Sequence, residues 1–195
     1  MAHVYDVTYG VIKPTDNLVI IDDSIVRGTT LQKSILKMLD RLNPKKIIIV
    51  SSAPQIRYPD CYGIDMAKID NFIVFKATLK LLEDRNILEQ TLESIYSKCK
   101  LNQDYPIEKV ENCVRALYEP FSNEQISAKI AQMLKGNNIK AKVEVIFQTI
   151  EGLHKACPKN LGDWYFSGDY PTPGGNRVVN RAFMNFYEGK SVRAY

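Results

Sequence analysis

Two aliphatic runs enclose a segment with helical periodicity, and this order constrains the fold more than any other feature. The runs cover residues 18–21 and 47–50, and such runs are typical of strands buried on both faces of a parallel sheet. Between them, apolar residues fall on one face of a helix: Leu31, Ile35, Leu36, Met38, Leu39 and Leu42. Asn43 and Pro44 are predicted to end that helix. The segment therefore predicts a right-handed strand–helix–strand unit of an α/β protein.

The length and charge bound the class of protein. The 195 residues are enough for one domain with a sizeable core, or for one domain with a helical appendage. The net charge is +4, and Lys and Arg are scattered rather than gathered in arms that bind nucleic acid. The sequence has no signal peptide pattern and no apolar run long enough to cross a bilayer. We therefore expect a cytoplasmic protein that binds neither nucleic acid nor membrane.

The cysteine pattern argues against a zinc site. The four cysteines contain no CxxC pair, and His3 and His154 are far apart in sequence. In a reducing cytoplasm, the default expectation is four free thiols: Cys61, Cys99, Cys113 and Cys157.

Beyond the second strand the pattern becomes mainly helical. Residues 51–66 are predicted to form a loop at the edge where open parallel sheets bind ligands. Helical periodicity follows in three stretches, namely from residue 67 to residue 96, at 107–117 and at 123–134. The third stretch has Ser122 or Asn123 as its N-cap and Gly136 after its end. Residues 143–147 predict a further strand, and residues 162–195 show no regular pattern.

The candidate site lies where the first strand meets its helix. Asp22 and Asp23 end the strand, and their carboxylates can accept hydrogen bonds from sugar hydroxyls or bind Mg²⁺. Gly28, Thr29 and Thr30 lead into the helix, whose free N–H groups and dipole favour a phosphate. The pattern GxxxxGK[ST] is absent, which excludes a Walker-type loop. Two acids that merely cap the helix are the alternative interpretation, but it leaves the ordered loop sequence unexplained.

Two strings carry a resemblance to a known family. The string IIDDSIVRGTT at 20–30 resembles the phosphoribosyl pyrophosphate (PRPP) signature of type I phosphoribosyltransferases. The string SAPQIRYPDCYGIDM at 52–66 is similar to the A-P-x-I-R-x-P-x-x-Y-G-I-D-M segment of one branch, the amidophosphoribosyltransferases. The resemblance implies an incomplete phosphoribosyltransferase-like parallel sheet flanked by helices. We predict a partial core with the PRPP-binding loop at 1–85, and a mainly helical C-terminal region with an irregular tail at 86–195.

The family's activity is the first committed step of purine synthesis, in which ammonia from glutamine displaces pyrophosphate from PRPP. The resemblance implies that Asp22 and Asp23 act in catalysis, hold the ribose hydroxyls and bind the Mg²⁺ that accompanies pyrophosphate. It also implies that the 5′-phosphate of PRPP lies in the following residues: Ser24, Ile25, Val26, Arg27, Gly28, Thr29 and Thr30. Purine nucleotide inhibitors are implied to compete for the same loop.

The chain departs from the family at its start and at one cofactor site. Family members begin, after processing, with a catalytic cysteine, which Met1 and Ala2 do not match. We therefore expect a C-terminal fragment whose partner is the missing glutaminase domain. The fragment is expected to be inactive alone, and the full-length protein is expected to form a homo-oligomer. Some members carry an iron–sulfur cluster, but here one ligand position falls on Asp60 and the tail string at 164–171 has no cysteine. We expect no cluster.

One alternative function and two further residues remain open. The alternative is a binding module that senses PRPP or a purine nucleotide without catalysis. Such a regulator would normally carry a DNA-binding helix-turn-helix or a basic arm, and the sequence shows neither pattern. Arg57 and Tyr62 are candidates to line the cleft, although surface exposure or local packing is the favoured interpretation. Arg27 is equally suited to holding the loop and to contacting substrate.

Overall fold

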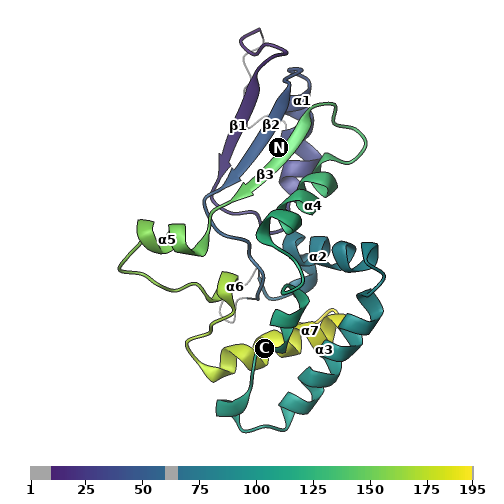
Figure 1. The fold of residues 1–195 in the computed structure, drawn as a ribbon, viewed down its shortest axis with the longest axis vertical. Helices are drawn as coiled ribbons and strands as arrows, with labels where there is room; N and C mark the ends of the chain where they lie inside the picture. The colour runs from purple at the N-terminus through teal and green to yellow at the C-terminus, as the bar shows by residue number, and fades with distance from the viewer. Residues whose placement is uncertain (1–9, 60–65, 195) are drawn as a thin grey trace.

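The computed structural model describes residues 10–59 and 66–194, and its strands form one parallel sheet (Figure 1). The order is β1-β2-β3, with bounds Asn17–Asp22, Lys46–Ser51 and Lys142–Phe147. Asp22 lies beside Ser51, and Ser51 beside Phe147, so the carboxyl ends of all three strands meet at one edge. The predicted α/β fold class and all three predicted strands are confirmed.

Helices of the described residues cover one face of this sheet. The covering helices are a π-helical segment, η1 (Leu31–Ile35), its continuation α1 (Leu36–Asp40), and α4 (Asn123–Lys135), which packs on β3. Ile47 and Ile49 are fully buried on that face, whereas Val19 and Ile21 of β1 are 59% and 74% exposed. Strand side chains alternate between faces, and in β1 every second residue is half-buried while the others are exposed. The prediction of a first strand buried on both faces is therefore wrong for the described part of the chain.

A group of helices lies beyond the carboxyl edge of the sheet (Figure 1). It contains η2 (Ile69–Asn71), α2 (Ile73–Asp84), α3 (Leu88–Gln103) and α7 (Pro173–Tyr187). The predicted irregular tail is thus wrong, because it holds α7 and the short helix α6 (Trp164–Ser167). The glycines at 174 and 175 weaken the local helical signal, and burial of Val179 and Phe183 stabilises the helix instead.

The predicted helix at 107–117 is also wrong, because two 3₁₀ turns replace it, η3 (Ile107–Lys109) and η4 (Cys113–Leu117). The Asn112 side chain accepts a hydrogen bond from Val114 N and starts η4. The buried Asn180 of α7 donates to Glu111 O and accepts from Cys113 N. Side chains therefore satisfy the backbone groups that a continuous helix would use.

The prediction for α4 is confirmed, including a capping box between Ser122 and Gln125 and Gly136 at its end. Helix α5 (Ile150–Ala156), capped by Thr149, was not predicted. No helix in the described ranges is long and apolar enough to cross a membrane.

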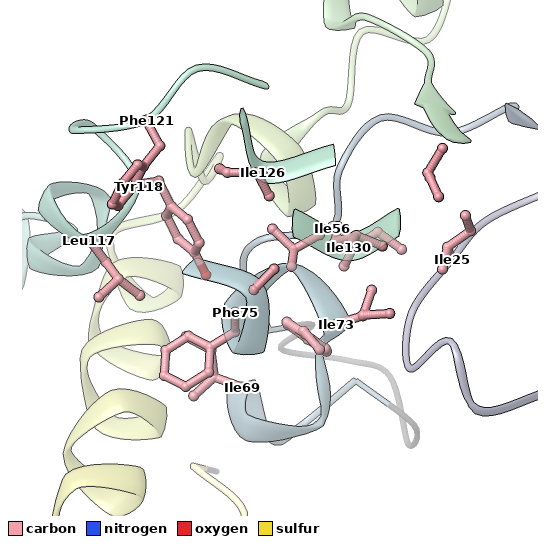
Figure 2. Packing of buried hydrophobic residues seen from close by; sticks show 14 of the residues in the cluster. Ile25, Ile56, Ile69, Ile73, Phe75, Leu117, Tyr118, Phe121, Ile126 and Ile130 are labelled. Carbon is pink, nitrogen blue, oxygen red and sulfur yellow. The ribbon is translucent and has the colours of Figure 1, made fainter. Parts of the chain in front are cut away.

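The core joins the sheet to the helical group. Figure 2 shows Ile25, from the loop after β1, near Ile73 of α2 and Ile130 of α4, with Phe75 and Tyr118 further along the same cluster. All five side chains are buried. The division at residue 85 stays a prediction, and β3, which comes from the second predicted region, pairs with β2 of the first.

Candidate functional site

The two predicted acids lie at the carboxyl edge of the sheet. Asp22 is the last residue of β1, and residues 29 and 30 are already helical, so residues 23–28 form the connecting loop. Asp22 O accepts a hydrogen bond from Ser52 N at 2.9 Å, and Asp23 O accepts one from Ala53 N at 3.0 Å. These bonds hold the acids against the segment that follows β2. Long-range pairing of this kind leaves no signal in the sequence around Asp22.

The two carboxylates share a local hydrogen-bond chain. Asp22 Oδ1 accepts from Asp23 N at 3.1 Å, and Asp23 Oδ1 accepts from Ser24 N at 2.6 Å. Burial raises the pKa of Asp22, the hydrogen bond from Asp23 N opposes that rise, and the negative charge of Asp23 adds to it. A cation or a set of hydroxyl donors at this edge would relieve both the desolvation and the repulsion. The donor set, two adjacent carboxylates, is of the hard oxygen type that Mg²⁺ prefers.

The loop after the acids is anchored on its inner side. Ile25 is buried in the core, and Val26 O accepts a hydrogen bond from Ile73 N at 2.8 Å. Gly28 has a φ of +67°, a conformation that favours glycine, and its carbonyl accepts from Gln32 N at 3.0 Å. The backbone of the loop is therefore fixed between α2 and the first turn of the following helix.

The outer side of the loop carries the polar groups. Arg27, Thr29 and Thr30 are exposed, and Ser24 is half-buried. The two threonines stand in the first helical turn, where N–H groups lack intrahelical partners. The turn continues into the π-helical η1, a geometry often found at functional sites. All nine predicted residues thus form one continuous strand end, loop and helix start, and the sequence pattern did not predict the π-helical turn.

Arg57 packs locally rather than toward the acids. One of its terminal nitrogens donates to Gln55 Oε1 at 2.8 Å and to Asn123 Oδ1 at 2.5 Å. Its guanidinium also lies 5.3 Å from the centroid of the Tyr118 ring. This arrangement agrees with the favoured interpretation of local packing. Tyr62 lies outside the described residues.

The acids predicted to bind Mg²⁺ lie within the described residues, whereas the predicted cluster position does not. Within residues 10–59 and 66–194, no group of three or more His, Cys, Asp or Glu side chains is placed to hold a metal ion. Asp60 and Cys61, near the predicted cluster position, lie outside these ranges. The absence of an iron–sulfur cluster therefore stays a prediction, and so does Mg²⁺ at Asp22 and Asp23.

Known proteins match the chain over parts of its length. No family model matches it. The amidophosphoribosyltransferase of Haemophilus influenzae is 49% identical over 59 residues, which are 30% of this chain and 12% of that protein. Its counterpart in Saccharomyces cerevisiae is 29% identical over 135 residues, or 66% of this chain and 26% of that protein.

A third relative with partial similarity is also an amidophosphoribosyltransferase. The amidophosphoribosyltransferase of Schizosaccharomyces pombe is 35% identical over 88 residues, covering 43% of this chain and 16% of that protein. The chain therefore spans between 12% and 26% of the length of these three relatives. Together with the parallel sheet and its acidic strand end, the matches identify the chain as a relative of the amidophosphoribosyltransferases that corresponds to a part of these proteins.

Proposed function

We propose that this chain forms the sugar-phosphate side of the transferase site of an amidophosphoribosyltransferase. The reaction would convert PRPP and glutamine to 5-phosphoribosylamine, glutamate and pyrophosphate, in the first committed step of purine synthesis. One observation carries the proposal: Asp22 ends β1, Asp23 begins the loop, and the loop backbone is fixed by hydrogen bonds from Ile73 N and Gln32 N. A loop that is already fixed loses little conformational entropy when it binds a phosphorylated ribose.

Each part of the site has a proposed role. The carboxylates of Asp22 and Asp23 accept hydrogen bonds from the two ribose hydroxyls and stabilise positive charge on the anomeric carbon as pyrophosphate leaves. Ser24, Thr29 and Thr30 donate to the 5′-phosphate, together with the N–H groups of the helix start. A Mg²⁺ ion held by the two acids would neutralise charge on the leaving pyrophosphate. Purine nucleotides, which also carry a ribose phosphate, would compete for the same groups.

Calorimetric titration with PRPP, with and without Mg²⁺, tests the site. We expect binding that depends on Mg²⁺ and that a purine nucleoside monophosphate displaces. The double variant Asp22→Asn and Asp23→Asn should lose the Mg²⁺-dependent part, whereas the surface variant Asp70→Asn should bind as the parent does. The assignment of the acids would be refuted if PRPP affinity did not depend on Mg²⁺ and did not change in the double variant.

The proposed activity needs a separate assay. We propose that it requires this chain joined to a glutaminase domain and to the remaining part of a transferase domain, in a cytoplasmic homo-oligomer. Pyrophosphate release by that longer protein should then depend on PRPP together with glutamine or ammonia. A longer protein that binds PRPP but never releases pyrophosphate would instead be a sensor.

A further inference from the structure

β3 has a hydrogen-bonding edge that no other described strand occupies. In the order β1-β2-β3 it pairs only with β2. Lys142 N donates to Lys45 O, and Gln148 N donates to Ser51 O, so the even-numbered residues of β3 face β2. The N–H and C=O groups of Val143, Val145 and Phe147 therefore point away from the sheet. An edge of this kind can pair with another chain.

A groove of about 630 Å³ runs along this edge. One wall is formed by residues 142–150, and because consecutive strand residues point to opposite faces, the groove lies beside β3 rather than over one face. The other wall is α4, which lies alongside β3 in Figure 1. It contributes one stripe of side chains: Glu124, Ser127, Ala128, Ala131, Gln132 and Lys135.

The dimensions of the groove suit an extended segment. Six strand residues and thirteen helical residues are each about 20 Å long, so both walls match a strand of about six residues. Ser127, Ala128 and Ala131 are small and leave room in the middle of the helical wall. A strand paired to β3 could place every second side chain against them. A helix would not suit the edge, because its own backbone bonds use its N–H and C=O groups.

Charge distinguishes the two ends of the groove. Lys135 and Lys142 stand where α4 ends and β3 begins. Glu144 forms an ion pair with Lys46 and also interacts electrostatically with Lys142, but one carboxylate does not balance three lysines. At the other end, Arg57 is held by the side chains of Gln55 and Asn123. The lysine end therefore favours a carboxylate on the occupant.

We propose that this groove binds an extended segment of another polypeptide, which adds a fourth strand at the outer edge of β3. The segment carries β-branched or other apolar side chains at alternate positions, facing Ser127, Ala128 and Ala131. It carries an acidic residue beside Lys135 and Lys142. Backbone hydrogen bonds supply much of the affinity in this recognition mode, and the side chains supply specificity. The site is separate from the loop at Asp22, and none of the residues 22–30 lines it.

Two capped peptides test the proposal. In Ac-EVTVTV-NH2, Glu reaches the lysine end if the peptide runs parallel to β3, and in Ac-VTVTVE-NH2, Glu reaches it if the peptide runs antiparallel. We expect one of them to bind in calorimetric titration. Its binding should slow amide hydrogen exchange at Val143, Val145 and Phe147 by about tenfold or more. The amides of Glu144 and Ile146, which face β2, should change little. Pro in place of the alternate residues whose N–H groups face β3 should weaken binding; these are the Thr residues in the parallel orientation and the Val residues in the antiparallel one.

Variants of the groove make the test specific. Lys135→Glu with Lys142→Glu should weaken peptide binding by about tenfold, while the matched pair Lys76→Glu and Lys80→Glu on exposed positions of α2 should not. Ala128→Trp, an exposed position in the wall, should block binding while the fold persists by circular dichroism.

Three outcomes would overturn the proposal. They are binding by neither peptide, binding that leaves the three outward amides unprotected, and protection of these amides that rises with protein concentration in the absence of peptide. The last would mean that a second copy of the chain occupies the edge.

Discussion

The side chain of Ile73 packs directly on the backbone of Gly28, and a Cβ added at Gly28 would overlap Ile73 Cδ1. The backbone of Ile73 also reaches the loop, since its N–H donates to Val26 O at 2.8 Å. The first residue of α2 therefore fixes the candidate phosphate loop from the inside. The φ of +67° at Gly28 favours glycine, and a Cβ there would in addition force the end of the Ile73 side chain to move.

Gly28→Ala is expected to lower the free energy of unfolding by about 2 kcal/mol, because it adds both backbone strain and crowding. Urea denaturation measures the loss. Gly136→Ala is the matched control, since its φ is +53° but a Cβ there meets nothing within 4 Å. Its loss should be smaller. Adding Ile73→Val to Gly28→Ala should restore part of the stability. Equal losses at the two glycines would argue against the packing contribution.

Asp22→Asn should leave the unliganded protein at least as stable as the parent at pH 7. Burial and the neighbouring Asp23 raise the pKa of Asp22, so its charged form is disfavoured in the folded state. Removing the charge should raise Tm by about 1–3 °C while weakening Mg²⁺-dependent PRPP binding. Differential scanning calorimetry and ligand titration on the same sample check both. A variant that loses stability and binding together would point to a structural role instead.

Asn180→Ala should destabilise the protein by about 1–2 kcal/mol, because it leaves two half-buried backbone groups without their hydrogen-bond partner. Asn180 Nδ2 donates to Glu111 O at 2.8 Å, and its Oδ1 accepts from Cys113 N at 3.1 Å. Asn176→Ala removes one bond, to Val110 O, at a half-buried site and should cost less. Chemical denaturation compares the two variants. Similar costs would show that Asn180 is not what joins α7 to the turns at 107–117.

Ionisation of Tyr58 should contribute to a fall in stability at alkaline pH, beside that of the buried Tyr118, whose pKa burial also raises. Burial raises the pKa of Tyr58 from 10 to about 12. The folded state therefore favours the neutral phenol, so this contribution is complete below pH 10 and is lost as the pH rises through 12. The loss amounts to roughly 3 kcal/mol. Tyr58→Phe should flatten the dependence of Tm on pH between 9.5 and 12, and the surface variant Tyr105→Phe should not. An unchanged slope in Tyr58→Phe would contradict this account.

Much of the candidate site could be predicted from local sequence. The aliphatic run before Asp22, the loop to Thr30 and the helix after it each depend on neighbours a few residues apart. The capping box at Ser122 is local in the same sense. The Gly28–Ile73 contact could not be predicted this way, because it joins residues far apart in the chain and depends on how α2 packs.

Side-chain contacts across the fold explain the remaining differences. The pattern at 107–117 favours a helix, but Asn112 and Asn180 satisfy its backbone groups in two 3₁₀ turns. The tail at 162–195 has weak local preference, yet α7 forms because burial of its apolar face outweighs the two glycines near its start.

Short contiguous strings were enough to predict the strand–helix–strand unit, the acids at its strand end and the kinship to the amidophosphoribosyltransferases. The packing of distant segments established three further features: β1 is covered on one face, Arg57 packs on Asn123, and β3 ends the described sheet with an open edge beside α4. These features depend on which distant segments meet, and the free energy of such contacts comes from burial and hydrogen bonds that no local pattern records.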